Sequence, residues 1–100
     1  MIIVAGSFEM DPAERAAFLA GRTEVMRRSR AEAGCLEYTF SADPLDPGRV
    51  VLLERWESQA ALDAHLVVLR SGGPAAGDDV RPTAQEIAVY EIAAVRRLGG

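Results

Sequence analysis

The spacing of hydrophobic and polar residues changes within the stretch Val50–Leu69, and the rest of the chain can be arranged around this change. Its first four residues, Val50–Leu53, are all β-branched or aliphatic, which predicts a strand with apolar side chains on both faces. Ser58 is then a suitable N-cap for a helix. A stripe with the spacing i, i+3, i+4 and i+7 follows at Leu62, His65, Leu66 and Leu69. The stretch therefore predicts a buried strand that leads into an amphipathic helix, with His65 on the inward face of that helix.

Another helix is predicted after Asp11–Glu14, where the chain reads Asp-Pro-Ala-Glu. Asp is a common N-cap, Pro suits the first helical position, and a Glu three residues after the cap completes the start signal. Two adjacent rows of mostly apolar residues continue from Phe18 to Ala33 and form a stripe broad enough to cover a sheet. Gly34 is expected to end this helix in a left-handed conformation.

The remaining segments read as strands and turns. Strands are predicted at Ile2–Phe8, Cys35–Ala42 and Thr83–Arg96, the second of them from a clean alternation that puts Leu36, Tyr38 and Phe40 on one face. Turn-forming residues in Asp43–Gly48 join two strands as an antiparallel hairpin, and Ser71–Pro82 predicts a mobile loop.

The predicted order is strand, helix, strand, strand, helix, strand over a single domain of residues 1–100. This is the ferredoxin-like split βαβ pattern of an α+β protein, in which a four-stranded antiparallel sheet carries both helices on one face. The strand that begins at Val50 is apolar on both faces, so its helix-free side also needs a cover. We therefore expect a homodimer formed by sheet-on-sheet packing, a dimeric α/β barrel.

Composition excludes several classes of protein. A formal net charge of −4 and a pI near 4.9 argue against a nucleic-acid-binding surface. The sequence has no apolar run of the roughly 20 residues that a membrane span requires, and its apolar start lacks the basic lead of a secretory signal. One cysteine, Cys35, excludes an internal disulfide and a multi-thiolate metal site. These features predict a cytoplasmic protein without a metal site or a membrane partner.

His65 is the candidate catalytic base. A neutral imidazole in a closed apolar pocket between helices and sheet could take a proton from a phenol or a carbon acid near neutral pH. The alternative is a core histidine hydrogen-bonded to a backbone carbonyl or to Glu54. Trp56, at the end of the strand, either forms the floor of a pocket for a planar ligand or fills a corner of the core.

Further candidates for substrate binding are the aromatic, apolar and acidic residues expected around this pocket. Each of the aromatic residues has the alternative role of packing in the core. The candidates are Phe8, Tyr38, Phe40, Glu54, Leu62, Leu66 and Tyr90.

The chain resembles the antibiotic biosynthesis monooxygenase domain family, which includes quinol monooxygenases. The resemblance rests on Gly34–Tyr38, on Glu54–Ser58 and on the pairs Ala61-Leu62 and Ala64-His65, and it follows nearly the whole chain in order and length. It implies a dimeric α/β barrel that oxygenates an anthrone- or quinol-type aromatic, or one derived from a polyketide, with O₂ and without flavin, haem or metal. It also aligns Trp56, His65 and Glu54 with the conserved block of the family.

The chain departs from its relatives in two ways. Many relatives carry a second His shortly after the first, and none follows His65 here. The related haem-degrading proteins use an Asn and a later His, whereas this sequence has no Asn, which disfavours haem degradation. The alternatives that stay open are a non-catalytic dimeric module that binds a small molecule, and an isomerase or dehydratase on the same scaffold.

Overall fold

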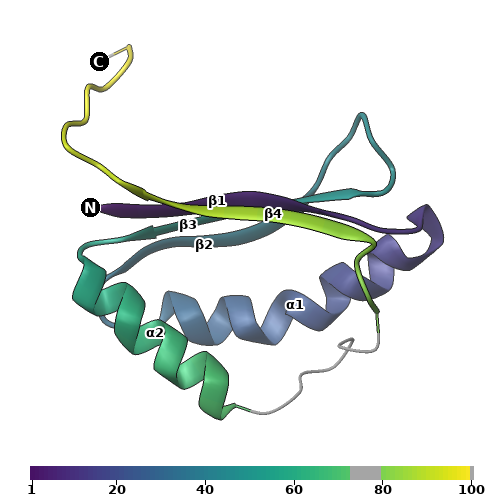
Figure 1. Ribbon diagram of the computed structural model, residues 1–100, viewed down its shortest axis with the longest axis horizontal. Coiled ribbons are helices and arrows are strands. Elements are labelled where there is room, and N and C mark those ends of the chain that lie inside the picture. The colour runs from purple at the N-terminus through teal and green to yellow at the C-terminus, as the bar shows by residue number, and fades with distance from the viewer. Residues whose placement is uncertain (73–79, 100) are drawn as a thin grey trace.

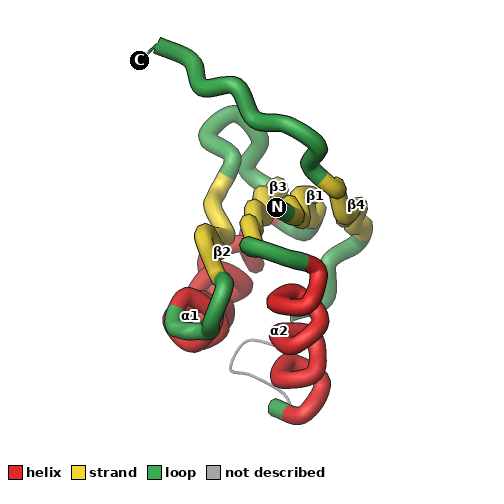
Figure 2. The backbone as a smooth tube through the Cα atoms, turned by 90° about the vertical axis from the view of Figure 1, so that its left-hand side faces the viewer, coloured by secondary structure: helices red, strands yellow, loops and turns green. Residues whose placement is uncertain are grey.

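The computed structural model describes residues 1–72 and 80–99 of the chain. Its sheet is antiparallel with the strand order β2-β3-β1-β4, and both helices lie on the same side of it (Figure 1 and Figure 2). This arrangement confirms the ferredoxin-like split βαβ fold. The elements are β1 (Ile2–Glu9), the 3-10 turn η1 (Pro12–Glu14), α1 (Arg15–Arg30), β2 (Cys35–Ala42), β3 (Arg49–Trp56), α2 (Gln59–Ser71) and β4 (Ala84–Glu91).

The apolar run at the centre of strand β3 places apolar side chains on both faces of the sheet. Val50 and Leu52 are almost fully buried against the helices. Val51 and Leu53 alternate with them and point to the helix-free face, where Leu53 is 37% exposed. The prediction of a strand with two apolar faces is therefore confirmed, and no described helix covers the second of these faces.

Two predicted boundaries and one predicted face assignment were wrong, although the elements themselves are present. Helix α1 ends at Arg30, and Gly34 adopts its left-handed conformation, with φ of 82°, in the turn that follows. Strand β4 ends at Glu91 rather than at Arg96, because Glu91 already pairs with Ile2, the first residue of β1. Leu36 lies at an irregularity in the pairing of β2 with β3 and is 45% exposed, so it leaves the row of Tyr38.

The predicted cap residues are confirmed, Ser58 for α2 and Asp11 for the 3-10 turn that precedes α1. Asp11 accepts a hydrogen bond from the backbone N–H of Ala13 at 2.9 Å, although the turn that it caps is η1 and not yet α1. Ser58 accepts one from the N–H of Ala61 at 3.2 Å and so caps α2. The loop predicted over residues 71–82 falls largely on residues 73–79, which lie outside the described part of the chain.

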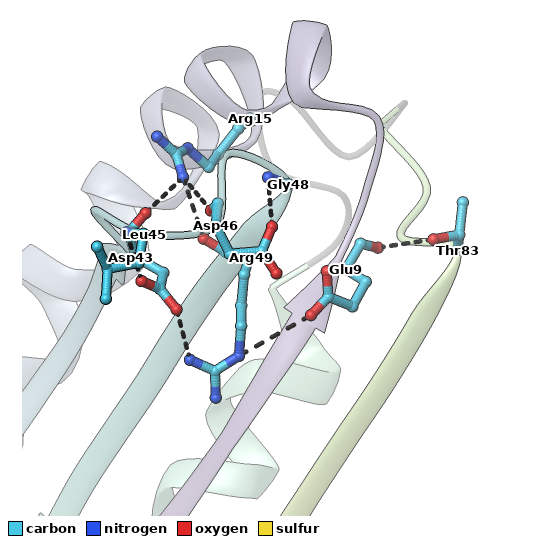
Figure 3. A network of polar contacts seen from close by, with 8 residues as sticks. All are labelled: Glu9, Arg15, Asp43, Leu45, Asp46, Gly48, Arg49 and Thr83. Carbon is cyan, nitrogen blue, oxygen red and sulfur yellow. Dashed lines mark hydrogen bonds and ion pairs between the residues drawn. The ribbon is translucent and has the colours of Figure 1, made fainter.

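A polar network fixes the end of the sheet where β3 begins (Figure 3). Arg15 donates from one guanidinium nitrogen to the backbone carbonyls of Asp43 and Asp46 at 3.0 and 2.8 Å. Arg49 donates to the Asp43 carboxylate at 3.0 Å. The N–H of Leu45, followed by the Arg49 side chain, lowers the pKa of Asp43 below its usual range. These contacts hold the β2–β3 loop against the start of α1, at the opposite end of β3 from Trp56.

The core between sheet and helices contains a continuous row of rings. Ring centroids are 5.3 Å apart for Phe8 and Phe18, 5.9 Å for Phe8 and Phe40, and 5.9 Å for Phe40 and Tyr38. Beyond Tyr38 the row continues to Trp56 at 6.4 Å. Tilted and edge-on pairs at these separations are favourable, so the row gives the space between sheet and helices a rigid aromatic floor.

Candidate functional site

His65 lies in the core where α2 crosses the end of β3. Its side chain is 1% exposed, and its ring centroid is 4.6 Å from that of Trp56 and 5.2 Å from that of Tyr38. The helical stripe predicted this inward position. Leu62, which lies on the preceding turn of the same stripe, is also buried. The ring is held between two aromatic neighbours, which fixes its orientation.

Two carboxylates flank the imidazole. Nδ1 of His65 lies 3.2 and 3.1 Å from the two carboxylate oxygens of Glu32, in the turn after α1. Nε2 lies 3.9 Å from Oε1 of Glu54 and has no hydrogen-bond partner among the described residues. A proton on Nδ1 satisfies the carboxylate of Glu32, and this tautomer leaves Nε2 as a buried acceptor.

Glu54 itself is bound to Trp56 rather than to His65. The indole Nε1–H donates to Oε1 of Glu54 at 2.9 Å, and the carboxylate is 6% exposed. Burial raises the pKa of Glu54, while the indole hydrogen bond and the positive charge that His65 can carry oppose the rise. A core histidine was predicted to form a hydrogen bond with a backbone carbonyl or with Glu54. In the structure Glu54 is only a neighbour of His65, and the hydrogen bond is formed with Glu32.

Tyr38 contacts the histidine ring and also lines a neighbouring cleft. The residue is 3% exposed, and burial is the main cause that raises the pKa of its hydroxyl, with the charge of Glu54 adding to the effect. Its phenol therefore stays protonated across the physiological range and acts as a hydrogen-bond donor or as an apolar wall.

A cleft of about 270 Å³ opens next to this cluster, between α1, α2 and β2. Tyr38 and Phe40 line it from the sheet, and Glu32 lines it where α1 ends. His65 is not among the residues that line it, whereas its two contacts Glu32 and Tyr38 are. The other lining residues are Arg22, Val25, Arg28, Ser29, Val68, Leu69 and Gly72.

The structure brings together most of the residues expected at the site. His65, Trp56, Tyr38, Glu54 and Leu62 form one buried cluster.

The other expected residues lie at or beyond the edge of this cluster. Phe40 continues the cluster into the cleft, and Phe8 lines an adjoining hollow that also contains Phe40. Leu66 is 38% exposed and lines neither space. Tyr90 pairs with Ile3 and lies on the helix-free face, 52% exposed, so it is separated from the cluster by the sheet.

Glu32 is the residue that sequence reasoning missed. It lies 33 positions before His65, so no local spacing connects the two side chains. No sequence signal marks it, because the apolar rows that continue to Ala33 predict Glu32 inside the helix, whereas α1 ends at Arg30 and leaves Glu32 in the turn that follows.

In residues 1–72 and 80–99, no group of three or more His, Cys, Asp and Glu side chains is arranged to hold a metal ion. No helix in the described part of the chain is long and apolar enough to cross a bilayer.

The arrangement is that of a ferredoxin-like α+β protein with a ring-lined cleft between sheet and helices. The family model described as antibiotic biosynthesis monooxygenase matches residues 1–67, and the chain belongs to this family.

The chain is also similar to individual proteins. A crystal structure of a "putative antibiotic biosynthesis monooxygenase" from Deinococcus radiodurans superposes with a TM-score of 0.82 at 25% identity, over 100% of both chains. The "Putative monooxygenase YcnE" of Bacillus subtilis is 29% identical over 65 residues, which are 65% of this chain and 68% of that protein. The "Uncharacterized protein sll1783" of Synechocystis is 34% identical over 64 residues, 64% of this chain but only 44% of that longer protein.

Proposed function

We propose that this protein is a cofactor-independent monooxygenase that oxidises a quinol- or anthrone-type aromatic, including one derived from a polyketide, with O₂. The observation that carries the proposal is the cleft of about 270 Å³, which has aromatic walls and a carboxylate backed by a buried imidazole. A planar aromatic fits walls of this kind. Membership of the family supports the class of reaction.

The reaction requires few groups from the protein. A base removes a proton from the phenol or from the activated CH₂ group, and the electron-rich anion then transfers electrons to O₂ and combines with it. Loss of water from the resulting peroxide gives the oxidised ring, so one oxygen atom enters the product and the other leaves as water. A quinol and O₂ thus give a hydroxyquinone and water, and an anthrone and O₂ give an anthraquinone and water. The protein supplies the base, orientation and a dry pocket.

In this proposal the Glu32–His65 pair supplies the base, and Trp56 holds the imidazole in place through ring contact at 4.6 Å. The proposal also includes a homodimer through the helix-free face of the sheet. Val51 and Leu53 lie on that face, and Tyr90 is 52% exposed there. A second copy packed on the sheet would remove these apolar side chains from water.

The test is O₂ uptake by chelator-treated protein with a panel of anthrones and reduced naphthoquinones, measured against autoxidation in buffer. We expect uptake above that background and one ¹⁸O atom from ¹⁸O₂ in each product molecule. A matched pair of variants locates the site. Val68→Trp fills the cleft and should abolish uptake, whereas Val67→Trp adds the same side chain at the preceding position, which does not line the cleft, and should leave uptake unchanged.

A second candidate function is a non-catalytic module that binds a small aromatic molecule. It is favoured by the burial of His65, which is 1% exposed and packed between two rings like a core residue. Binding in the wild type that Val68→Trp blocks, with no O₂ uptake for any substrate, would support the module and contradict the oxygenase. Product formation without O₂ uptake would instead indicate an isomerase or dehydratase.

A further inference from the structure

Glu32 and His65 form a pair in which only the acidic member can reach the cleft. The imidazole is 1% exposed and is not among the residues that line the cleft. The side chain of Glu32 is 21% exposed and lines the cleft. A base must come within hydrogen-bond reach of the proton that it removes, about 2.6–3.2 Å between heavy atoms. The imidazole does not meet this condition for a ligand in the cleft, whereas the carboxylate does.

We propose that Glu32 is the residue that accepts the substrate's proton, and that His65 is a positioning residue that acts through it. This inference rests on the proposed function and deepens it, since it names the reacting group of the same site. It also defines the ligand as a neutral aromatic with an acidic O–H or C–H that points toward the turn after α1.

The geometry of the pair fits these roles. Nδ1–H of His65 lies 3.2 and 3.1 Å from the two Glu32 oxygens, so one donor bridges the carboxylate and fixes its plane. A carboxylate has about four acceptor positions, and those on the side of the cleft stay open to a substrate. In the step itself the substrate's O–H or C–H bond breaks, its electron pair stays on the substrate, and the proton forms a new O–H bond with Glu32. The net charge of the cleft does not change in this transfer.

The charged and titratable groups around Glu32 come from every element that packs against it. Arg22 and Arg28 line the same cleft from α1 and offer positive charge toward the anion that forms. Tyr38 on β2 presents its phenol. Glu54 on β3 adds negative charge behind the imidazole, where its Oε1 lies 3.9 Å from Nε2. The carboxylates of Glu32 and Glu54 thus lie on the side toward which the proton moves, and the arginines lie along the cleft that holds the ligand.

Turnover in three variants tests the assignment. Glu32→Gln keeps the size of the side chain and an acceptor for His65 but removes the base, and it should lower kcat by about 100-fold or more with little change in KM. His65→Asn retains an N–H donor near Nδ1 and should keep much of the activity, whereas His65→Leu removes the donor and should lose it. The matched control is Glu24→Gln, an exposed carboxylate of α1 outside the cleft, which should leave kcat unchanged. Circular dichroism confirms the fold of each variant.

A binding measurement separates this inference from the oxygenase proposal. The probe is 4-nitrophenol, because its phenolate alone is yellow and its absorbance reports the ionised fraction when bound. Beside the Glu32 carboxylate the wild type should bind the neutral phenol, so its affinity should fall as the phenol ionises with rising pH. Glu32→Gln removes the opposing charge and should bind the phenolate at least as well as the phenol.

The outcomes are distinct. A changed ionisation of the bound phenol in Glu32→Gln, with no O₂ uptake by any form, supports the contact with Glu32 and contradicts only the oxygenase. Full O₂ uptake by Glu32→Gln overturns the inference and leaves the oxygenase standing. Equal ionisation of the phenol in the wild type and Glu32→Gln, or no binding to either, also overturns it.

Discussion

The hydrogen bond from Trp56 to Glu54 gives a prediction whose size and pH dependence both follow from the structure. Trp56→Phe removes the indole N–H that donates to Oε1 of Glu54 at 2.9 Å and leaves a buried carboxylate without this donor. A hydrogen bond to a charged group contributes about 1.5–3 kcal/mol. The smaller ring also leaves unfilled volume beside Leu62, which costs roughly 1 kcal/mol. We expect the free energy of unfolding near neutral pH to fall by about 3 kcal/mol.

The pH dependence follows from the direction of the Glu54 pKa. Burial holds this pKa above its usual value in the folded protein, and the indole hydrogen bond opposes the rise. In Trp56→Phe the pKa therefore rises further. A group whose pKa is raised by folding favours the folded state while it is protonated, and this contribution is lost as pH rises through the folded-state pKa. The decrease in the free energy of unfolding caused by Trp56→Phe should thus be smallest near the ordinary carboxyl pKa of about 4.3 and larger at neutral pH.

Urea unfolding followed by far-UV circular dichroism measures the effect, because the variant lacks the only Trp. Both proteins are compared at the same concentration, at about pH 4.5 and about pH 8. Glu54→Gln provides the matched background, since its amide oxygen still accepts from the indole but does not titrate. In that background the deficit should be independent of pH. An equal deficit at both pH values in the wild-type background would refute the reasoning.

Three further predictions follow from single positions. Gly6→Ala should lower the stability by about 2–3 kcal/mol in thermal unfolding, because a Cβ would lie 2.1 Å from the carbonyl oxygen of Glu86 on the backbone of β4; an unchanged melting temperature would contradict this contact. Ser58→Ala removes the cap of α2 and should cost about 1 kcal/mol in urea unfolding, whereas Ser58→Asp should not; equal loss in both would argue against capping. Leu53→Asp places a charge on the helix-free face and should convert a dimer to a monomer in analytical ultracentrifugation; a wild type that sediments as a monomer would disprove the proposed interface.

Much of the fold could be predicted because its signals are local. The apolar run at Val50, the caps at Asp11 and Ser58, and the alternation in β2 each depend on residues within a few positions of one another. Where a boundary depended on a distant partner the prediction was wrong. Strand β4 shows this clearly, since its apolar pattern continues to Val95 but its pairing ends where Glu91 meets the start of β1.

The positions of some residues of the candidate site could likewise be predicted from local patterns, and those of others could not. Periodicity alone was sufficient to turn His65 inward, and alternation put Tyr38 and Phe40 on one shared face, which the structure shows to be the helix side of the sheet. Periodicity could not separate Tyr90 from these residues, because a strand with apolar side chains on both faces does not reveal which face meets the helices.

The elements, their order and the inward direction of the only histidine could thus be predicted from the amino-acid sequence, because they follow from short-range spacing and capping. The contact at 3.1 Å between Glu32, in the turn after α1, and Nδ1 of His65 became visible in the folded chain alone, as did the position of the carboxylate rather than the imidazole in the lining of the cleft. A contact between residues 33 positions apart depends on how α1 and α2 pack on the sheet, and no local pattern encodes that packing.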